Sequence, residues 1–290
     1  MRNSFIDKLV FEAQKNSKIV LVAGDIGYSV VEKFSTAFPN RFFNAGVAEQ
    51  NMTGLAAGLA SEGHLVFTYS IGNFPTFRCA EQIRNDIAYH NLPVTVVSVG
   101  GGVAYGPAGY SHHAIQDYAF VRSLPNMLIA SPGDKTETAL CIDYLIRNPQ
   151  PSFLRLGTAP EKNLTRSLRS LQPGIWQKVS ARAGRERRTC ALSTGGALKH
   201  AQALFELGDV DAVYTMPLWG ANHKKVQSAQ LEKYEQVITC EDHLIDGGFG
   251  SWLLESAGRN RNKIHIKSLS SMVCGKVGSE QALWSFGGLK

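Results

Sequence analysis

The sequence has few of the features that mark secreted, membrane or metal-cluster proteins. Its 290 residues include five cysteines. They are widely spaced and form no CxxC pair: Cys79, Cys141, Cys190, Cys240 and Cys274. This spacing favours reduced thiols over a disulfide framework or a zinc site. No apolar run is long enough to span a bilayer, and Asp7 and Lys8 interrupt any signal-peptide core at the N-terminus. We therefore expect a cytoplasmic chain that does not bind membranes.

Signals for nucleic-acid and dinucleotide binding are also missing. The formal charge of +6 is concentrated in segment 161–188, which holds eight basic and two acidic residues. No aromatic platform is interleaved with these charges, so a solvated basic linker is favoured over an RNA- or DNA-binding segment. No GxGxxG motif follows the first expected strand, which argues against a nicotinamide-dependent dehydrogenase.

What the sequence does contain is an alternation of strands and helices, with enough apolar residues (44%) for large cores. The apolar and β-branched runs predict strands at 18–25, 41–46, 64–70, 92–100, 126–134, 151–157, 189–196, 211–218, 236–242 and 263–269. The segments between them predict helices at 4–17, 48–60, 76–91, 114–123, 135–147, 197–207, 223–234 and 249–258. This pattern is typical of α/β domains with parallel sheets. We expect two such domains, residues 1–160 and 189–290, joined by the linker 161–188.

One carboxylate stands at the head of an apolar helix. Helix 48–60 is expected to bury Met52, Leu55, Ala56 and Leu59, and Gly54 and Gly58 would let another backbone approach closely. Glu49 falls in its first turn. There a negative charge is stabilised by the helix dipole, or a buried carboxylate is held ready for a ligand that pairs with it. The residues alone leave both interpretations open.

The stretch NAGVAEQNMTGLAAGLASEG, residues 44–63, resembles the pyrimidine-binding segment of the transketolase family of thiamine diphosphate enzymes. The resemblance continues through FTYSIGNFPTFRCAEQIRNDIAYHNLPV, GYSHHAIQDYAFVRSLPNMLIASPGD and PSFLRLG, and resumes in LSTGGALKHAQAL and ITCEDHLIDGGFGSWLLE. It covers nearly the whole chain except the basic linker. It implies the C-terminal portion of a transketolase, which is a pyrimidine-binding domain followed by a smaller C-terminal domain.

The resemblance also implies roles for residues near the cofactor. Glu49 would be catalytic, because the family glutamate hydrogen-bonds N1′ of the cofactor's aminopyrimidine and favours its imino tautomer. Phe74 and Phe77 would stack on the pyrimidine ring. Asp25 and Ser29, in GDIGYS, match a loop that reaches the cofactor and the substrate respectively.

Other implied roles concern the substrate. His112 would be catalytic and contact the sugar donor, and a histidine is a natural proton carrier near neutral pH. His113 and Arg155 would complete the substrate site, Arg155 by gripping phosphate. Gly100 and Ala108 stand where many sugar-phosphate members carry a His and an Asp, so the acceptor would differ from an ordinary pentose phosphate. The CEDH stretch, residues 240–243, has no active-site counterpart in the family and is left outside the site.

The diphosphate half of a cofactor site is absent. AGDIGYS has no glycine after Gly-Asp, and no Asn-Asn ligand pair follows. We expect no metal ligands in this chain. A separate N-terminal subunit would bind the diphosphate and Mg²⁺, in a dimer of heterodimers that transfers a ketol unit between sugars. The alternatives are the β subunit of a 2-oxo acid dehydrogenase E1 component and a non-catalytic assembly or regulatory subunit.

Overall fold

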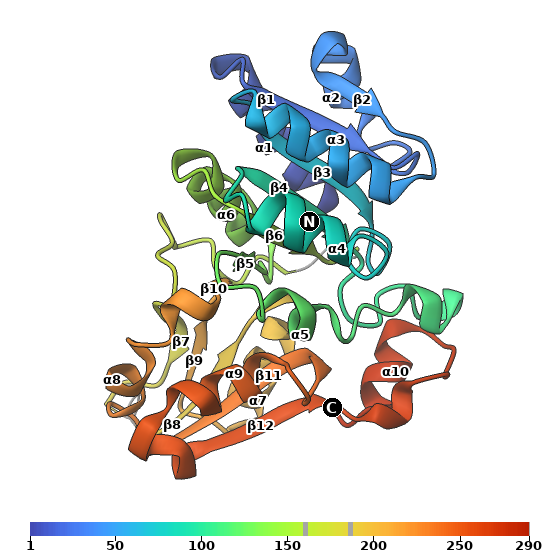
Figure 1. Cartoon of the computed structure of the whole chain (residues 1–290). Coiled ribbons are helices and arrows are strands. Elements are labelled where there is room, and N and C mark those ends of the chain that lie inside the picture. The colour runs from blue at the N-terminus through green and yellow to red at the C-terminus, as the bar shows by residue number, and fades with distance from the viewer. Residues whose placement is uncertain (159–161, 185–187, 290) are drawn as a thin grey trace.

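The computed structural model describes residues 1–158, 162–184 and 188–289, and its strands form two sheets, one above the other in Figure 1. The first sheet is built from β1 (Ile19–Ala23), β2 (Phe42–Asn44), β3 (Leu65–Ile71), β4 (Val94–Val99), β5 (Leu128–Ala130), β6 (Ser152–Leu156) and β10 (Leu218–Trp219). Their order is β10-β5-β6-β4-β3-β1-β2. All neighbours are parallel except β10, which runs antiparallel to β5.

Helices cover both faces of this sheet, which explains the continuous apolar strands. On one face lie α1 (Arg2–Lys15), α2 (Glu32–Ala37) and α6 (Lys135–Arg147). On the other lie α3 (Glu49–Ser61) and the π-helical segment Ile83–Ala88. Every residue of β1, β4 and β6 is buried between these layers.

The segment 76–91, predicted as one helix, is not regular. Residues 72–79 form turns, a short helix α4 (Ala80–Gln82) follows, and a π-helix runs over Ile83–Ala88. The Thr76 hydroxyl donates to the Gly72 carbonyl and the Cys79 thiol lies 3.4 Å from the Phe74 carbonyl. These local bonds satisfy the backbone in a turn conformation and delay the helix start.

The second sheet has the order β12-β11-β8-β9-β7. Its strands are β7 (Gln177–Ala181), β8 (Thr189–Ser193), β9 (Ala212–Thr215), β11 (Gln236–Leu244) and β12 (Ile264–Leu269). The helices α5 (Asp117–Val121), α7 (Leu198–Leu207), α8 (Gln227–Leu231), α9 (Phe249–Ser256) and α10 (Glu280–Phe286) complete the molecule. The expectation of two mostly parallel α/β sheets is confirmed.

Two details differ from the expected linker and second domain. Strand β7 lies inside segment 161–188 and pairs antiparallel with β9, so part of the predicted linker is an edge strand. Residues 161 and 185–187 of that segment lie outside the described residues. Strand β10, expected as the end of a strand 211–218, instead pairs with the first sheet. Within the described residues no helix is long and apolar enough to cross a membrane.

Candidate active site

Polar side chains gather at the carboxyl ends of β1, β2 and β3, the edge at which open parallel sheets bind ligands. Asp25 follows β1, Asn44 ends β2, and Ser70 lies near the end of β3. Helix α3 begins at the same edge with Glu49. The order of these strands therefore brings together residues that are far apart in the sequence.

Glu49 lies at the centre of this edge and is fully buried. Its Oε1 accepts a hydrogen bond from the Ser70 hydroxyl at 3.2 Å, and its Oε2 lies 2.5 Å from Nη1 of Arg78. A Cβ on Gly24 would lie 3.4 Å from the Glu49 side chain, so the first loop packs directly against it. A buried carboxylate needs partners of this kind. If Glu49 only stabilised the helix dipole, it could do so at an exposed helix end, so its complete burial favours the interpretation that it is held for a ligand.

Arg78 joins Glu49 to an aromatic pair. Its guanidinium lies 4.4 Å from the centre of the Phe74 ring, and the Phe74 and His112 rings meet edge to face with centroids 5.2 Å apart. Glu49, Phe74 and His112, three of the residues singled out from the sequence, therefore lie in one cluster. Arg78 was not singled out, although it directly follows Phe77 in the motif that was.

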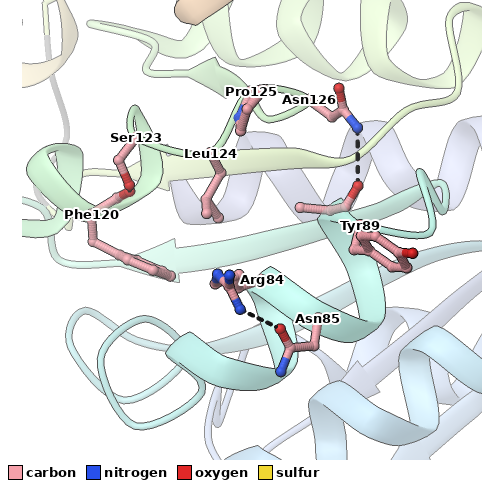
Figure 2. Close-up of a pocket in the computed structure, with 9 residues that line it drawn as sticks. Arg84, Asn85, Tyr89, Phe120, Ser123, Leu124, Pro125 and Asn126 are labelled. Carbon is pink, nitrogen blue, oxygen red and sulfur yellow. Dashed lines mark hydrogen bonds between the residues drawn. The ribbon is translucent and has the colours of Figure 1, made fainter.

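Phe77 lies on a different side of the turn. Its ring is 45% exposed and sits 6.5 Å, centre to centre, from that of Phe120. Phe120 lines a cavity of about 440 Å³. Figure 2 shows its other walls, with Arg84 and Asn85 opposite Ser123, Leu124 and Asn126. Glu49 does not line this cavity, so the cavity and the buried carboxylate are separate features.

Asp25 and Ser29 both have left-handed backbone conformations, with φ of 53° and 64°. Non-glycine residues seldom adopt them, and such strain often accompanies functional loops. The Asn44 side chain donates to Asp25 Oδ1 at 2.9 Å. Asp25 and Asn44 also line a small cavity of about 180 Å³, together with Tyr28 and Glu32. The loop after β1, which carries Asp25 and Ser29, therefore lies at the same sheet edge as Glu49 and adds a second carboxylate there.

The two neighbouring histidines have different surroundings. His112 is partly exposed and its Nδ1 lies 3.0 Å from the Ser111 hydroxyl. His113 is fully buried, its Nε2 lies 3.4 Å from the Gly106 carbonyl, and burial lowers the pKa of its imidazole. His113 therefore packs inside its own loop, and only His112 is open to a substrate.

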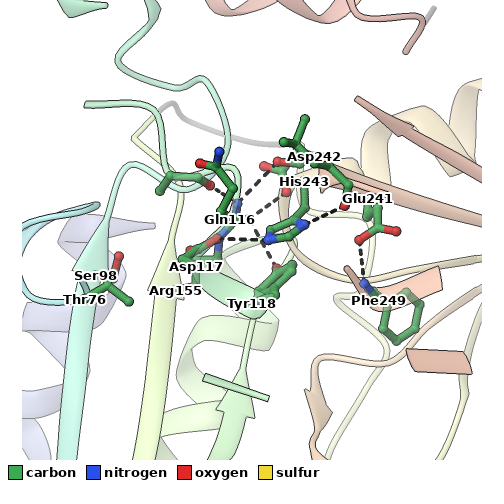
Figure 3. Close-up of polar contacts among 12 residues, drawn as sticks. Thr76, Ser98, Gln116, Asp117, Tyr118, Arg155, Glu241, Asp242, His243 and Phe249 are labelled. Carbon is green, nitrogen blue, oxygen red and sulfur yellow. Dashed lines mark hydrogen bonds and ion pairs between the residues drawn. The ribbon is translucent and has the colours of Figure 1, made fainter. Parts of the chain in front are cut away.

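The expectation that Arg155 grips substrate phosphate does not agree with its position. The side chain is 2% exposed. Its Nε donates to Asp117 at 2.7 Å, and its Nη1 donates to Asp242 at 2.6 Å and to the Tyr118 hydroxyl at 3.2 Å. Its Nη2 donates to the carbonyls of Ala114 and Asp242. A guanidinium has five N–H donors, and all of them are used within the chain, as the dashed lines around Arg155 in Figure 3 indicate.

Among the described residues, no group of three or more His, Cys, Asp or Glu side chains is arranged to hold a metal ion. The arrangement instead offers a buried carboxylate, a stacking aromatic ring and a partly exposed imidazole at one sheet edge. These groups can bind a heteroaromatic ring with hydrogen-bonding nitrogens and move a proton beside it.

Comparisons with known proteins agree with this arrangement. The family model described as transketolase, pyrimidine binding domain, matches residues 1–163. A Methanocaldococcus jannaschii protein named for a transketolase C-terminal section is 31% identical, over 100% of this chain and 92% of its own. A protein of Phocaeicola vulgatus, named as one subunit of apulose-4-phosphate transketolase, is 29% identical, over 91% of this chain and 86% of its own. A solved structure titled split gene transketolase, inactive beta4 tetramer, superposes with a TM-score of 0.83 at 27% identity, covering 100% of this chain and 93% of that one.

Proposed function

The chain belongs to the transketolase family and corresponds to its C-terminal section, and from this premise we propose that it is one subunit of a two-component enzyme that transfers a two-carbon ketol unit from a ketose to an aldose. The observation that carries the proposal is Glu49, a fully buried carboxylate at the carboxyl edge of a parallel sheet. Its position beside Phe74 and His112 gives a reason for burying it.

The residues present fit the pyrimidine half of thiamine diphosphate. Glu49 would hold the ring through one nitrogen, and Phe74 would stack on its face. In the chain alone Arg78 occupies both contacts, because it pairs with Glu49 at 2.5 Å and covers Phe74 at 4.4 Å. Its side chain is 44% exposed, so it can turn into solvent when a ring enters. The bound cofactor would supply the nucleophilic carbon and the electron sink.

The chain's own groups would hold and move protons around that ring. Glu49 would share a proton with the ring nitrogen, while Ser70 keeps the other carboxylate oxygen fixed at 3.2 Å. His112 would carry a proton to or from a sugar hydroxyl. Asp25 and Ser29 remain candidates for the rim of the same site. Phe77, His113 and Arg155 take no part in the proposal, because their contacts lie elsewhere.

The remaining parts of the site would come from a partner. We propose that an N-terminal transketolase-like subunit binds the diphosphate and Mg²⁺, and that the two chains form a dimer of heterodimers. The relatives named as a C-terminal section and as one subunit of a transketolase support this division. Because every donor of Arg155 is used within the chain, this residue gives no reason to expect recognition of a sugar phosphate.

The test uses the complex of this chain with its N-terminal partner. We expect Glu49→Gln to lower kcat/KM for ketol transfer by about 10²- to 10⁴-fold, the usual weight of a positioned acid–base group. The matched control is Glu62→Gln, which changes an exposed glutamate directly after α3. Circular dichroism would establish that both variants fold.

Three results would be informative. Unchanged ketol transfer by Glu49→Gln would show that the catalytic assignment is wrong. Activity on a 2-oxo acid without a ketose would favour the dehydrogenase E1 alternative. A wild-type complex that neither binds thiamine diphosphate in calorimetry nor converts either substrate class would favour a non-catalytic subunit.

A further inference from the structure

The loop that carries His112 is closed at its base by a pair of backbone hydrogen bonds. Gly102 and Ala114 exchange N–H···O bonds of 2.9 Å in both directions, forming an isolated antiparallel bridge. Between them the chain makes two short turns of 3-10 helix, Gly106–Ala108 and Tyr110–His112. The position of the His112 ring therefore depends on what holds this loop, residues 102–114, in place.

The base of the loop is held by a residue of the second sheet. Asp242, on β11, accepts from Arg155 Nη1 at 2.6 Å, and Arg155 Nη2 donates to the Ala114 carbonyl at 2.7 Å. Asp117 fixes the same guanidinium from a third side at 2.7 Å. Figure 3 shows Asp242 and Arg155 approaching from opposite sides of the network.

Two glycines allow this close approach. A Cβ on Gly101 would lie 2.7 Å from the Arg155 guanidinium carbon, and one on Gly102 would lie 2.6 Å from Asp242 Oδ2. Gly102 also has a φ of 67°, a conformation that glycine adopts without strain. Gly101 and Gly102 are thus explained as room for the Arg155–Asp242 pair, and Gly100 leaves room for the Tyr105 ring, without a phosphate ligand.

The first turn of the loop is held by the C-terminal helix. A Cβ on Gly106 would lie 2.7 Å from Leu283 of α10, and the Gly278 N–H lies 3.4 Å from the Gly106 carbonyl. Val103 of the loop and Ile115 directly after it share a small hydrophobic core with Val273, Leu283 and Trp284. Figure 1 shows α10 alongside this loop, away from the sheets.

We propose that the second domain positions the catalytic loop of the first, with Asp242 clamping its base through Arg155 and α10 clamping its first turn. Asp242 and Leu283 are then positioning residues for His112, and Arg155 serves the loop. The consequence for catalysis rests on the proposed function, because it uses His112 as a substrate contact. The clamp itself is a property of the chain.

The first experiment measures amide hydrogen exchange of the full chain. In Asp242→Asn, Arg155 keeps its bond to Asp117, so no buried charge loses every partner. We expect exchange in peptides covering 102–114 to accelerate at least tenfold. The matched control is Glu255→Gln, which also breaks an ion pair between the two domains, Arg122–Glu255 at 2.8 Å, but does not touch the loop. Equal exchange in Asp242→Asn and wild type, or equal acceleration in the control, would overturn the proposal.

A second variant tests the contact with α10, and it keeps the proposal testable if Asp242→Asn does not fold. Leu283→Ala should accelerate exchange around 103–110 and leave the Asp242 contacts in place. If the loop in this variant exchanges as slowly as in wild type, α10 does not position it.

The second experiment measures kinetics of the reconstituted complex. Asp242→Asn should lower kcat about tenfold or more while the affinity for thiamine diphosphate stays unchanged, because Glu49 and Phe74 lie outside the loop. Glu255→Gln should leave both values unchanged. The activity of His112→Ala decides how the result is interpreted. If His112→Ala lowers kcat, but Asp242→Asn exchanges faster without a lower kcat, the catalytic part of the proposal is overturned.

If His112→Ala is fully active, the role given to His112 in the proposed function is wrong. The exchange data still decide whether the clamp exists.

Discussion

Two buried carboxylates, those of Glu49 and Asp117, serve different purposes in the chain. Glu49 pairs with Arg78, a side chain that is 44% exposed and therefore replaceable by a ligand. Asp117 pairs with Arg155, which is 2% exposed and has no free donor. A buried carboxylate whose partner can leave suits a binding site, whereas one locked to a buried guanidinium suits the scaffold.

His243, at the edge of this network, gives the chain a predictable dependence on pH. Its Nδ1 donates to the Leu244 carbonyl at 2.7 Å, its Nε2 lies 3.8 Å from Asp117, and its ring stacks on Tyr118. Burial lowers the pKa of His243 from 6.5 to about 3. Between those values the unfolded chain binds a proton that the folded chain does not, so the free energy of unfolding decreases as the pH falls below 6.5.

From pH 7 to pH 5 this residue should cost about 2 kcal/mol of stability. Urea unfolding at the two pH values would measure it. We expect His243→Gln to remove that part of the pH dependence, and His265→Gln, which replaces an exposed histidine of β12, to leave it in place. A His243→Gln chain that loses as much stability as wild type on acidification would contradict the prediction.

At the scale of one element, α3 has an outer face that the chain itself does not cover. A Cβ added to Gly54 or Gly58 would meet no atom within 4 Å, and Leu55, expected inside, is 38% exposed between them. Leu55 faces out because the buried stripe of α3 runs through Met52, Ala56 and Ala60 and does not include it. An exposed leucine flanked by two glycines is what a closely packed helix contact with another subunit would use.

Alanine and leucine at these positions should act in opposite directions. Gly54→Ala and Gly58→Ala should each stabilise the isolated chain by about 0.5–1 kcal/mol, because glycine disfavours a helix and the space is open. Gly58→Leu should weaken binding to the N-terminal partner at least tenfold, since its side chain would fill the gap between the helices. Chemical denaturation and calorimetric titration would measure the two effects.

The control for the leucine variant is Glu206→Leu, which adds the same side chain to the exposed side of α7. It should bind the partner as wild type does. If Gly58→Leu also binds normally, this face of α3 is not the interface.

The elements that the sequence predicts well are those defined by local patterning. Helix 135–147 begins where Asp134 accepts from the Thr136 and Glu137 amides, and the buried strands follow from continuous β-branched runs. The π-helix Ile83–Ala88 and the strand β7 were missed, because their conformations depend on neighbours and not on periodicity. Strand β7 is held at the sheet edge by pairing with β9, whose paired residues lie 31 to 38 positions later in the sequence.

The same distinction applies to the candidate site. Glu49 and Phe74 were expected at one site only through the family resemblance, which is carried by motifs that are local in the sequence. The surroundings of Arg155 could not be predicted, because its partners Asp117 and Asp242 are 38 and 87 residues away in the sequence. Only the packing of the second sheet against the first decides that this arginine faces another domain instead of a substrate.

At the scale of the whole molecule, the two sheets share one hydrophobic core. Trp219, on β10, sits in the first sheet opposite Ile129, and its ring contacts Tyr118 and Phe249 at centroid distances of 5.1 and 5.2 Å. The same cluster contains Val22 and Met52 of the first domain and Leu192 and Trp252 of the second. A core that neither domain completes alone couples their unfolding.

We therefore expect a single thermal transition for the whole chain, with equal calorimetric and van't Hoff enthalpies. Trp219→Ala should lower stability by about 3–5 kcal/mol and divide the transition in two, because it removes a large side chain from the core that the two sheets share. Tyr89→Ala, at an aromatic residue that is 80% exposed, should change stability by no more than about 0.5 kcal/mol. Two transitions in the wild-type chain would show that the domains fold independently. In that case the second domain would hold the His112 loop less firmly. The loop would be released each time the second domain unfolded by itself.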